Sequence, residues 1–570
     1  MKRTTSAFLA IAAVGALTLS ACSSGGSQSG AASGGDKAAA DMPPLSDLNP
    51  MDRGELADGG TLRLPISTLP TNWNTLNVNG NNVDQGSTMA MFLEPTNWIY
   101  AEDGSFDKNP NFIEDYNSTD EGGKQVVTLN LNPKAVWGDG TPITVADYQA
   151  TVAACNGEQT EFNCASTDGY SSVESVEQGK DEYEVVITFE STYPDWSAPF
   201  STVWPAAGVK DAATFNDGWD KYNNDWFSGP FQVASVDDAQ QVITLERNPN
   251  WWGETALLDS VTLRAADPAA TATAFANSEL DVLSGIIDGA EYAQAAARSD
   301  AEIRRAGGLQ WRHFTFNGES GVLQDPAVRL ALTKGINREA ITTADLSGIP
   351  DIDPAQLMLG NHFFMPGQVG YQDNSAVSAY DPEQAGKDLD AAGWTLEEGA
   401  EYRTKDGETL QFEYTMMPDV STSKTEGELL QQQMKEIGVK VDIKNVSTAA
   451  FFDEYVIPGN FQTAAFAWQG TPYPLNNIGQ LYSCDSIDTG SNFTRTCVDE
   501  IDEMIPKIAA ETDPTKRNEM ANEVDKIIWE NVMFFPIYRR LEMTAVPTNL
   551  ANYGAFGMAS VPAENIGWMK

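Results

Sequence analysis

Histidine is nearly absent from this sequence, whose 570 residues include only His313 and His362. Histidine-based metal sites and Ser-His-Asp triads need imidazole groups, and two separate histidines do not supply a set of metal ligands. A lone histidine is usually a surface residue or a hydrogen-bonded core residue. We therefore expect no metal site and no cofactor in this chain.

Basic residues are scarce too, because 35 Lys and Arg stand against 81 Asp and Glu, a formal net charge of −46. Nucleic-acid binding requires clustered basic residues, so this class of protein is excluded, as is docking on anionic lipid by charge. With 41% hydrophobic and 10% aromatic residues, the chain is too apolar to be an acidic disordered protein. The acidic residues lack the spacing of a calcium loop, and we interpret them as solvated surface.

Long hydrophobic runs are missing after residue 19. The run at 8–19 follows Lys2 and Arg3 and is too short to span a bilayer, which is typical of a signal peptide. The next residues, Leu-Ser-Ala-Cys22, resemble a bacterial lipobox, so we predict a signal peptide at 1–21 and lipidation of Cys22. The alternative is an ordinary secretory cleavage site. Residues 22–57 are rich in Ser, Gly, Ala, Asp and Pro and predict a flexible tether that holds an extracytoplasmic body at the cell membrane.

Cysteine is limited to five residues, and four remain when Cys22 is set aside. Three pairings are possible, and an exported compartment permits disulfides. We favour the two local pairs, Cys155 with Cys164 and Cys484 with Cys497, which close short loops. A four-cysteine zinc site is the alternative, but it lacks any C-x₂-C spacing.

Three common catalytic motifs are missing, namely the P-loop, H-E-x-x-H and G-x-S-x-G. A glycosidase needs only a pair of carboxylates, but 81 acidic residues make chance pairs inevitable. We predict that the chain is not an enzyme. An assay for glycoside turnover would separate a carbohydrate enzyme from a binding protein.

Two kinds of pattern alternate along the rest of the chain and indicate a mixed α/β architecture. Strands are predicted at 61–66, 126–131, 183–189, 241–246 and 439–443. An Asp followed by Pro predicts a helix start at 325–326, 381–382 and 513–514, and Thr144 with Asp147 predicts a capping box. We also expect a helix at about 426–437 that ends at Gly438.

Five regions, taken in order, resemble one family of proteins. The first contains Trp-Gly-Asp-Gly at 137–140, the second Ser-Gly-Pro-Phe at 228–231 and Arg-Asn-Pro at 247–249, and the third the run from Asp325 to Arg338. The fourth is Tyr-Asp-Pro-Glu at 380–383 with Ala-Gly-Trp at 392–394, and the fifth is the pair 433–439 and 535–538. Over about residues 60–540 the sequence is similar to the large solute-binding proteins of bacterial peptide and nickel ABC importers, family 5.

This resemblance implies a two-lobed periplasmic-binding-protein fold of the large peptide-binding class (type II), with a small extra subdomain on the first lobe. By analogy the first lobe comprises 58–95, 225–310 and 535–570. The small subdomain comprises 96–224, and the second lobe comprises 311–534.

The resemblance also implies a set of ligand contacts. Residues 467–474 match a second-lobe segment in which peptide-binding relatives place an Asp three residues after a Trp, to hold the ammonium group of the ligand. Here Thr471 takes that position, a departure from the pattern for which Asp485 or Asp488 is a possible substitute. The expected contacts are Trp468, Gln469, Gly470, Thr471, Tyr473, Trp73, Trp98 and Asn317. Alternatively, the three Trp residues pack in the core or the wall between the lobes, and Asn317 belongs to the hinge.

The resemblance further implies a function. We expect a lipid-anchored receptor that closes on an oligopeptide or other small ligand and delivers it to an ABC permease with a separate ATPase. The alternative is a regulatory lipoprotein of the actinobacterial LpqW-like branch, which serves the assembly of phosphatidylinositol mannosides and lipomannan.

Overall fold

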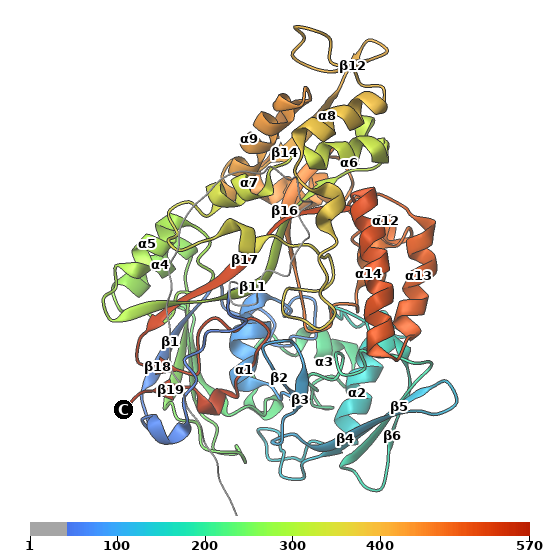
Figure 1. Ribbon diagram of the computed structural model, residues 1–570. Helices are drawn as coiled ribbons and strands as arrows, with labels where there is room; N and C mark the ends of the chain where they lie inside the picture. Colours follow the sequence, from blue (N-terminus) through green and yellow to red (C-terminus); the bar gives the residue numbers. More distant parts are fainter. Residues whose placement is uncertain (1–42) are drawn as a thin grey trace, which may run out of the picture. The chain divides into compact units, whose positions relative to one another are not determined.

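The computed structural model describes residues 43–570, and three β-sheets organise this part of the chain (Figure 1). The first-lobe sheet has the order β1-β10-β9-β8, in which β1 and β10 are parallel and the other neighbours antiparallel. Its strands are β1 (Thr61–Ile66), β8 (Phe231–Asp237), β9 (Val242–Arg247) and β10 (Ser260–Ala265). Alternate residues of β1 are buried, so one face of the sheet packs on the core.

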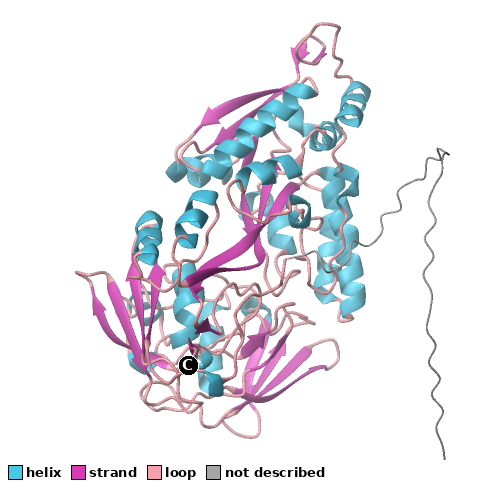
Figure 2. Cartoon of the chain, turned by 60° about the vertical axis from the view of Figure 1, so that its left-hand side comes forward, coloured by secondary structure: helices cyan, strands magenta, loops and turns pink. Residues whose placement is uncertain are grey.

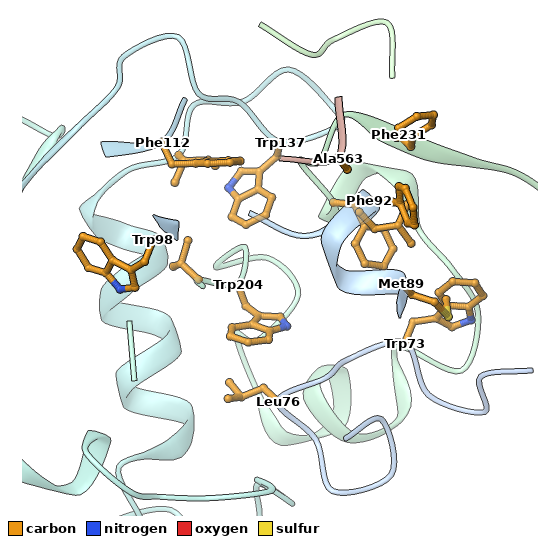
Figure 3. Packing of buried hydrophobic residues seen from close by; sticks show 14 of the residues in the cluster. Trp73, Leu76, Met89, Phe92, Trp98, Phe112, Trp137, Trp204, Phe231 and Ala563 are labelled. Carbon is orange, nitrogen blue, oxygen red and sulfur yellow. The ribbon is translucent and has the colours of Figure 1, made fainter. Parts of the chain in front are cut away.

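The subdomain sheet is antiparallel, with the order β4-β5-β7-β6. Its strands are β4 (Ile113–Asp120), β5 (Gln125–Leu131), β6 (Val173–Gln178) and β7 (Glu184–Phe189). The helix α2 (Val145–Cys155) packs against β6 and β7, and the capping box of Thr144 with Asp147 is present. The subdomain sheet and the first-lobe sheet share one aromatic-rich core, which includes Phe92, Trp98, Phe112 and Trp137 (Figure 3).

The second-lobe sheet has the order β15-β14-β16-β11-β17. Its strands are β11 (Ala301–Phe316), β14 (Gln411–Met416), β15 (Lys440–Asn445), β16 (Thr463–Gln469) and β17 (Phe534–Pro547). The long strands β11 and β17 pair antiparallel from Ala301 with Pro547 to Thr315 with Phe534, and the register shifts between Gly307 and Trp311. The predicted boundary between 310 and 311 therefore falls inside a strand that is shared by both lobes.

Helices flank the second-lobe sheet, as Figure 2 shows in cyan. The predicted caps at the Asp-Pro pairs are confirmed, because Asp325, Asp381 and Asp513 each accept hydrogen bonds from backbone N–H groups of the first helical turn. The helices of this lobe are α6 (Pro326–Lys334), α7 (Arg338–Asp345), α8 (Pro382–Ala391), α9 (Ser421–Glu436), α10 (Thr448–Ala450), α11 (Ile478–Tyr482), α12 (Ser486–Thr489), α13 (Asp499–Ala510) and α14 (Pro514–Asn531).

Shorter elements complete the described chain. The helical ones are η3 (Asp84–Met89), α1 (Ala90–Leu93), α3 (Ala212–Asp217), α4 (Pro268–Ala276) and α5 (Gly289–Ala296). Three two-stranded ribbons pair β2 (Trp98–Tyr100) with β3 (Phe106–Lys108), β12 (Thr404–Lys405) with β13 (Glu408–Thr409), and β18 (Leu550–Ala551) with β19 (Gly567–Trp568). Among the described helices, none is both long and apolar enough to cross a membrane.

Residues 43–57 differ from the predicted tether, because they lie against the folded body. The backbone of Asp47 bridges to Ala555, the backbone of Leu56 bridges to Met569, and Gly307 N–H donates to the carbonyl of Pro44 at 2.8 Å. The segment is polar in composition, and this favours a tether. Two of its residues, Leu48 and Leu56, are nevertheless buried against the body, at 9% and 2% exposed. The predicted signal peptide at 1–21, the lipidated Cys22 and the remaining tether lie outside the described residues.

Both local cysteine pairs are present in the structure, where Cys155 bonds Cys164 and Cys484 bonds Cys497. The first disulfide ties the end of α2 to the loop that follows it, and the second fastens the segment before α13. Disulfides that close short loops stabilise by restricting the unfolded chain, by about 2–3 kcal/mol each.

Candidate ligand-binding cavity

A cavity of about 820 Å³ lies where the first lobe meets β11 and β17. Its walls come from the end of β1, from η3 and α1, from the loop at 553–564, and from the register shift of the paired long strands. From the second lobe, Gln469 at the end of β16 reaches the cavity. Small-molecule sites in proteins span roughly 300–1,000 Å³, so this volume suits a ligand of several residues' size.

The charged side chains around this cavity are strongly unbalanced. One basic residue, Arg540, lines it together with five acidic residues, and within residues 43–570 none of the six takes part in an ion pair. The acidic residues are Asp84, Glu94, Glu291, Glu542 and Glu564.

Glu94 is the acidic residue with the fewest partners. It directly follows α1, so the carbonyl groups at the end of that helix add negative potential beside it. Its Oε1 accepts a hydrogen bond from the hydroxyl of Thr75 at 2.8 Å. Burial raises the pKa of Glu94 to about 7, and the bond from Thr75 opposes this only in part.

Glu542 is held differently. Its two oxygens accept hydrogen bonds from the backbone N–H groups of Phe556 and Gly557, at 2.8 and 2.9 Å. Burial raises the pKa of Glu542, while these two donors lower it. The carboxylate thereby fixes the 553–564 loop against β17. Two residues earlier on the same strand, Arg540 Nη1 donates to Oε1 of Gln310 at 3.2 Å, which is a neutral partner.

Two of the expected ligand residues line the cavity, Gln469 and Trp98. Trp98 is fully buried, and its Nε1 donates to the carbonyl of Ser197 at 2.9 Å. Gly470 lies next to the cavity wall, where its N–H donates to the carbonyl of Leu309 at 2.9 Å.

The remaining second-lobe candidates do not line the cavity. Trp468 is stacked between His313 and Phe493, with ring centroids at 6.1 and 5.8 Å and nearly parallel planes. The Thr471 hydroxyl accepts a hydrogen bond from the N–H of Tyr473, and its carbonyl accepts one from Gln368. The two candidate substitutes for Thr471 do not line the cavity either, and one of them, Asp488, pairs with Arg495 at 3.5 Å.

Trp73 and Asn317 have structural environments. Trp73 packs edge-on against Tyr222 and Phe227 in the first core (Figure 3). The side-chain amide of Asn317 donates to two carbonyls of the loop that precedes β16, at 3.0 and 2.8 Å. Neither residue lines the cavity, and their roles as ligand contact, packed residue or hinge residue stay predictions.

The two histidines are buried in the second lobe. The Nδ1 of His362 lies 2.7 Å from Oδ1 of Asp525, and its Nε2 lies 2.9 Å from the carbonyl of Phe534. Desolvation and the nearby Arg312 lower the pKa of His313 well below its ordinary value. Neither ring reaches the cavity wall.

A set of polar contacts joins the subdomain to the second lobe; we call it the closure contact. Arg517 on α14 donates two hydrogen bonds to the carboxylate of Asp195, at 2.8 and 2.6 Å. Nearby, the hydroxyl of Tyr193 donates to Asn476 at 2.7 Å, and the Tyr473 hydroxyl lies 2.9 Å from that of Ser197. The structure thus has the subdomain and the second lobe in direct contact.

Sequence reasoning missed the acidic residues of the cavity. A signal for Glu94 does exist, since it is the single charged residue between Asp84 and Glu102 and it follows an apolar run at 89–93. A charge in such an apolar setting indicates burial, and a buried charge indicates a partner or a ligand.

The two lobes, the subdomain and the cavity at the shared strands define a two-lobed solute-binding protein. The sequence matches the description "Bacterial extracellular solute-binding proteins, family 5 Middle" over residues 109–489, and the chain belongs to that family. The resemblance and the fold class inferred from the sequence are therefore confirmed.

Curated relatives include the oligopeptide-binding protein OppA of Mycobacterium tuberculosis, which is 38% identical over 560 residues, or 97% of this chain and 92% of OppA. A second relative from that organism is named "Probable monoacyl phosphatidylinositol tetramannoside-binding protein LpqW" and is 29% identical over 208 residues, 36% of this chain and 32% of LpqW.

Solved structures with the same fold include the periplasmic EDTA-binding protein EppA, with a TM-score of 0.81, 23% identity and coverage of 93% of this chain and 99% of EppA. Another is AppA from Bacillus subtilis in complex with a nonapeptide, with a TM-score of 0.72, 19% identity and coverage of 90% of this chain and 100% of AppA.

Proposed function

We propose that this chain is the lipid-anchored, extracytoplasmic substrate-binding protein of an ABC importer and that it binds oligopeptides. The observation that carries the proposal is the 38% identity to an oligopeptide-binding protein over 97% of the chain. The cavity of about 820 Å³ supports it, because it offers room for a short peptide.

The proposed mechanism is closure of the lobes on the ligand. Contacts that need both lobes exist only in the closed state, so ligand binding shifts the population toward that state. The closure contact between Arg517 and Asp195 favours the same state. The closed complex is then recognised by the permease, and the energy for transport comes from a separate ATPase subunit. Lipidation of Cys22 holds the receptor at the membrane.

Within this proposal, Gln469 is the expected residue that touches ligand, because it lines the cavity. The side chain of Trp98 lies behind the cavity wall and is fully buried. The other candidates act as framework: Trp468, Gly470, Thr471 and Tyr473 shape the second-lobe edge, and Trp73 and Asn317 belong to the packed interior.

The alternative, a regulatory protein of glycolipid assembly, is less well supported, because the similarity to LpqW covers only 36% of the chain. The two candidate functions differ in the ligand that the protein binds. We suggest mass spectrometry of small molecules released from protein purified without residues 1–22, followed by thermal-shift screening against a peptide library. A series of peptide masses supports the importer reading. Glycolipid masses, or an empty cavity with no response to peptides, would overturn it.

A further inference from the structure

We propose that the cavity selects ligands that carry a net positive charge, and that Glu94 is the residue that receives their ammonium or guanidinium group. This inference rests on the proposed binding function and deepens it by naming the chemical class of ligand.

The first step is the charge of the wall. Five carboxylates and one guanidinium face the same cavity, and no ion pair in the described chain neutralises any of them. Charges of one sign in a concave, poorly hydrated site focus their field on the enclosed volume. An anionic ligand is therefore repelled from this volume, and a cationic ligand is attracted.

The second step separates Glu94 from the other acidic residues. Asp84, Glu291 and Glu542 each accept hydrogen bonds from backbone N–H groups, and Glu564 accepts one from the amide of Asn111. These bonds satisfy part of each carboxylate. By contrast, Glu94 receives only the hydroxyl of Thr75, and no residue of the described chain donates to its Oε2.

A carboxylate with one free oxygen on the wall of a cavity lacks a counter-charge, and its free oxygen lacks a hydrogen-bond donor. A ligand ammonium group supplies both at once, through short charge-assisted hydrogen bonds. The raised pKa of Glu94, about 7, agrees with this geometry, because it reports that the folded protein alone does not stabilise the ionised form.

The third step concerns Arg540, whose side chain donates to the neutral Gln310 and to no other residue between 43 and 570. It can hold one carboxylate of a ligand. A peptide with free ends carries one terminal carboxylate and one ammonium, and each lysine or arginine adds a further cation. Such a peptide matches a wall of one guanidinium and five carboxylates better than a neutral peptide does.

The test is calorimetric titration of the protein with pentapeptides that differ only at the central residue, which is lysine, norleucine or glutamate. Norleucine keeps the apolar stem of lysine without its charge. Spermidine serves as a cation that is not a peptide. We expect the lysine peptide to bind at least about tenfold more tightly than the norleucine peptide, and the glutamate peptide to bind most weakly.

In the Glu94→Gln variant, the preference for lysine over norleucine should fall to about threefold or less. Glu383→Gln is the matched control, since it removes the same charge from an exposed position on α8. It should leave the ranking unchanged.

The outcomes separate the two proposals. Binding of all three peptides with equal affinity to the unmodified protein would overturn the charge inference and leave the peptide receptor intact, and this comparison needs no variant. Binding of spermidine alone, lost in Glu94→Gln, would support the charge inference and overturn peptide binding. An unchanged lysine preference in Glu94→Gln would overturn the role of Glu94.

Discussion

At the scale of a single residue, ionisation of Glu94 makes the free energy of unfolding depend on pH. Its pKa is about 7 in the folded, ligand-free protein, against an ordinary value of 4.5. The folded state thus keeps a proton that the unfolded state has already lost. Stability from this group is therefore complete below about pH 4.5 and is lost as the pH rises toward 7, by up to about 3 kcal/mol.

We expect the Glu94→Gln variant to escape this loss. Without ligand, it should be more stable than the unmodified protein at pH 8, by about 1–3 kcal/mol, and nearly equal to it at pH 4.5, because glutamine mimics the protonated acid. Urea denaturation at both pH values measures the difference. Parallel pH profiles for the two proteins would contradict the prediction.

Residue identity alone could not define the cavity wall. A local sequence pattern predicts Trp468 and Thr471 as ligand contacts, but Trp468 is stacked between His313 and Phe493 and does not line the cavity. Conversely, Glu94 reaches the wall because it follows α1, which packs against β8, a strand far away in sequence. The hydrophobic pattern of a sequence indicates which residues are buried. Which residues form the wall of a cavity depends on tertiary contacts.

At the scale of elements, the strand predictions agree with the structure within one or two residues, because alternation of buried and exposed residues defines a strand locally. The helix expected at about 426 instead begins at Ser421. Its first turns contain Thr422, Ser423 and Gly427, small residues that are buried but do not read as an apolar stripe. The helix extends to Ser421 because its first turns pack closely against their neighbours, although they show no apolar periodicity.

Gly427 illustrates this packing. A Cβ atom at this position would collide with the ring of Tyr414, which is fully buried and donates its hydroxyl to the carbonyl of Ser423. Glycine to alanine usually stabilises a helix by about 1 kcal/mol. Here we expect Gly427→Ala to destabilise the protein by about 1–3 kcal/mol, because the ring cannot move away.

The control for this substitution is Gly479→Ala in α11, where the added methyl meets Ile505 at an ordinary contact distance of 3.6 Å. We expect a change between zero and about 1 kcal/mol of stabilisation. Thermal unfolding monitored by circular dichroism compares the two variants. A gain in stability for Gly427→Ala would show that α9 and β14 are packed less closely than described.

At the scale of the whole molecule, the closure contact joins two parts that lie far apart in the sequence. Arg517 and Asp195 are separated by 322 residues, and their side chains are each 11% exposed, so this ion pair is largely shielded from water. The resemblance predicted two lobes that close, but no sequence pattern could predict which residues meet. Such an ion pair forms only when the two folded surfaces meet, so no periodic pattern in the sequence indicates it.

We expect Arg517→Lys to weaken ligand binding by about tenfold, because lysine cannot make the two parallel hydrogen bonds to Asp195. The open state should become more populated, which small-angle X-ray scattering detects as a larger radius of gyration without ligand. Lys387→Ala, which breaks an exposed ion pair with Glu383, is the control. Equal radii and equal affinities for Arg517→Lys and the unmodified protein would remove the ion pair from the closure mechanism.

The segment at 43–57 has a mechanical consequence. Around Leu45 it meets the shared strand β11 at Gly307, the second-lobe loop at Gly367, and the closing loop at Gly557. The segment is thus fastened to three separate parts of the body. A pull that reaches the body through this segment is shared among these parts. Such a load does not fall on one loop or one strand alone.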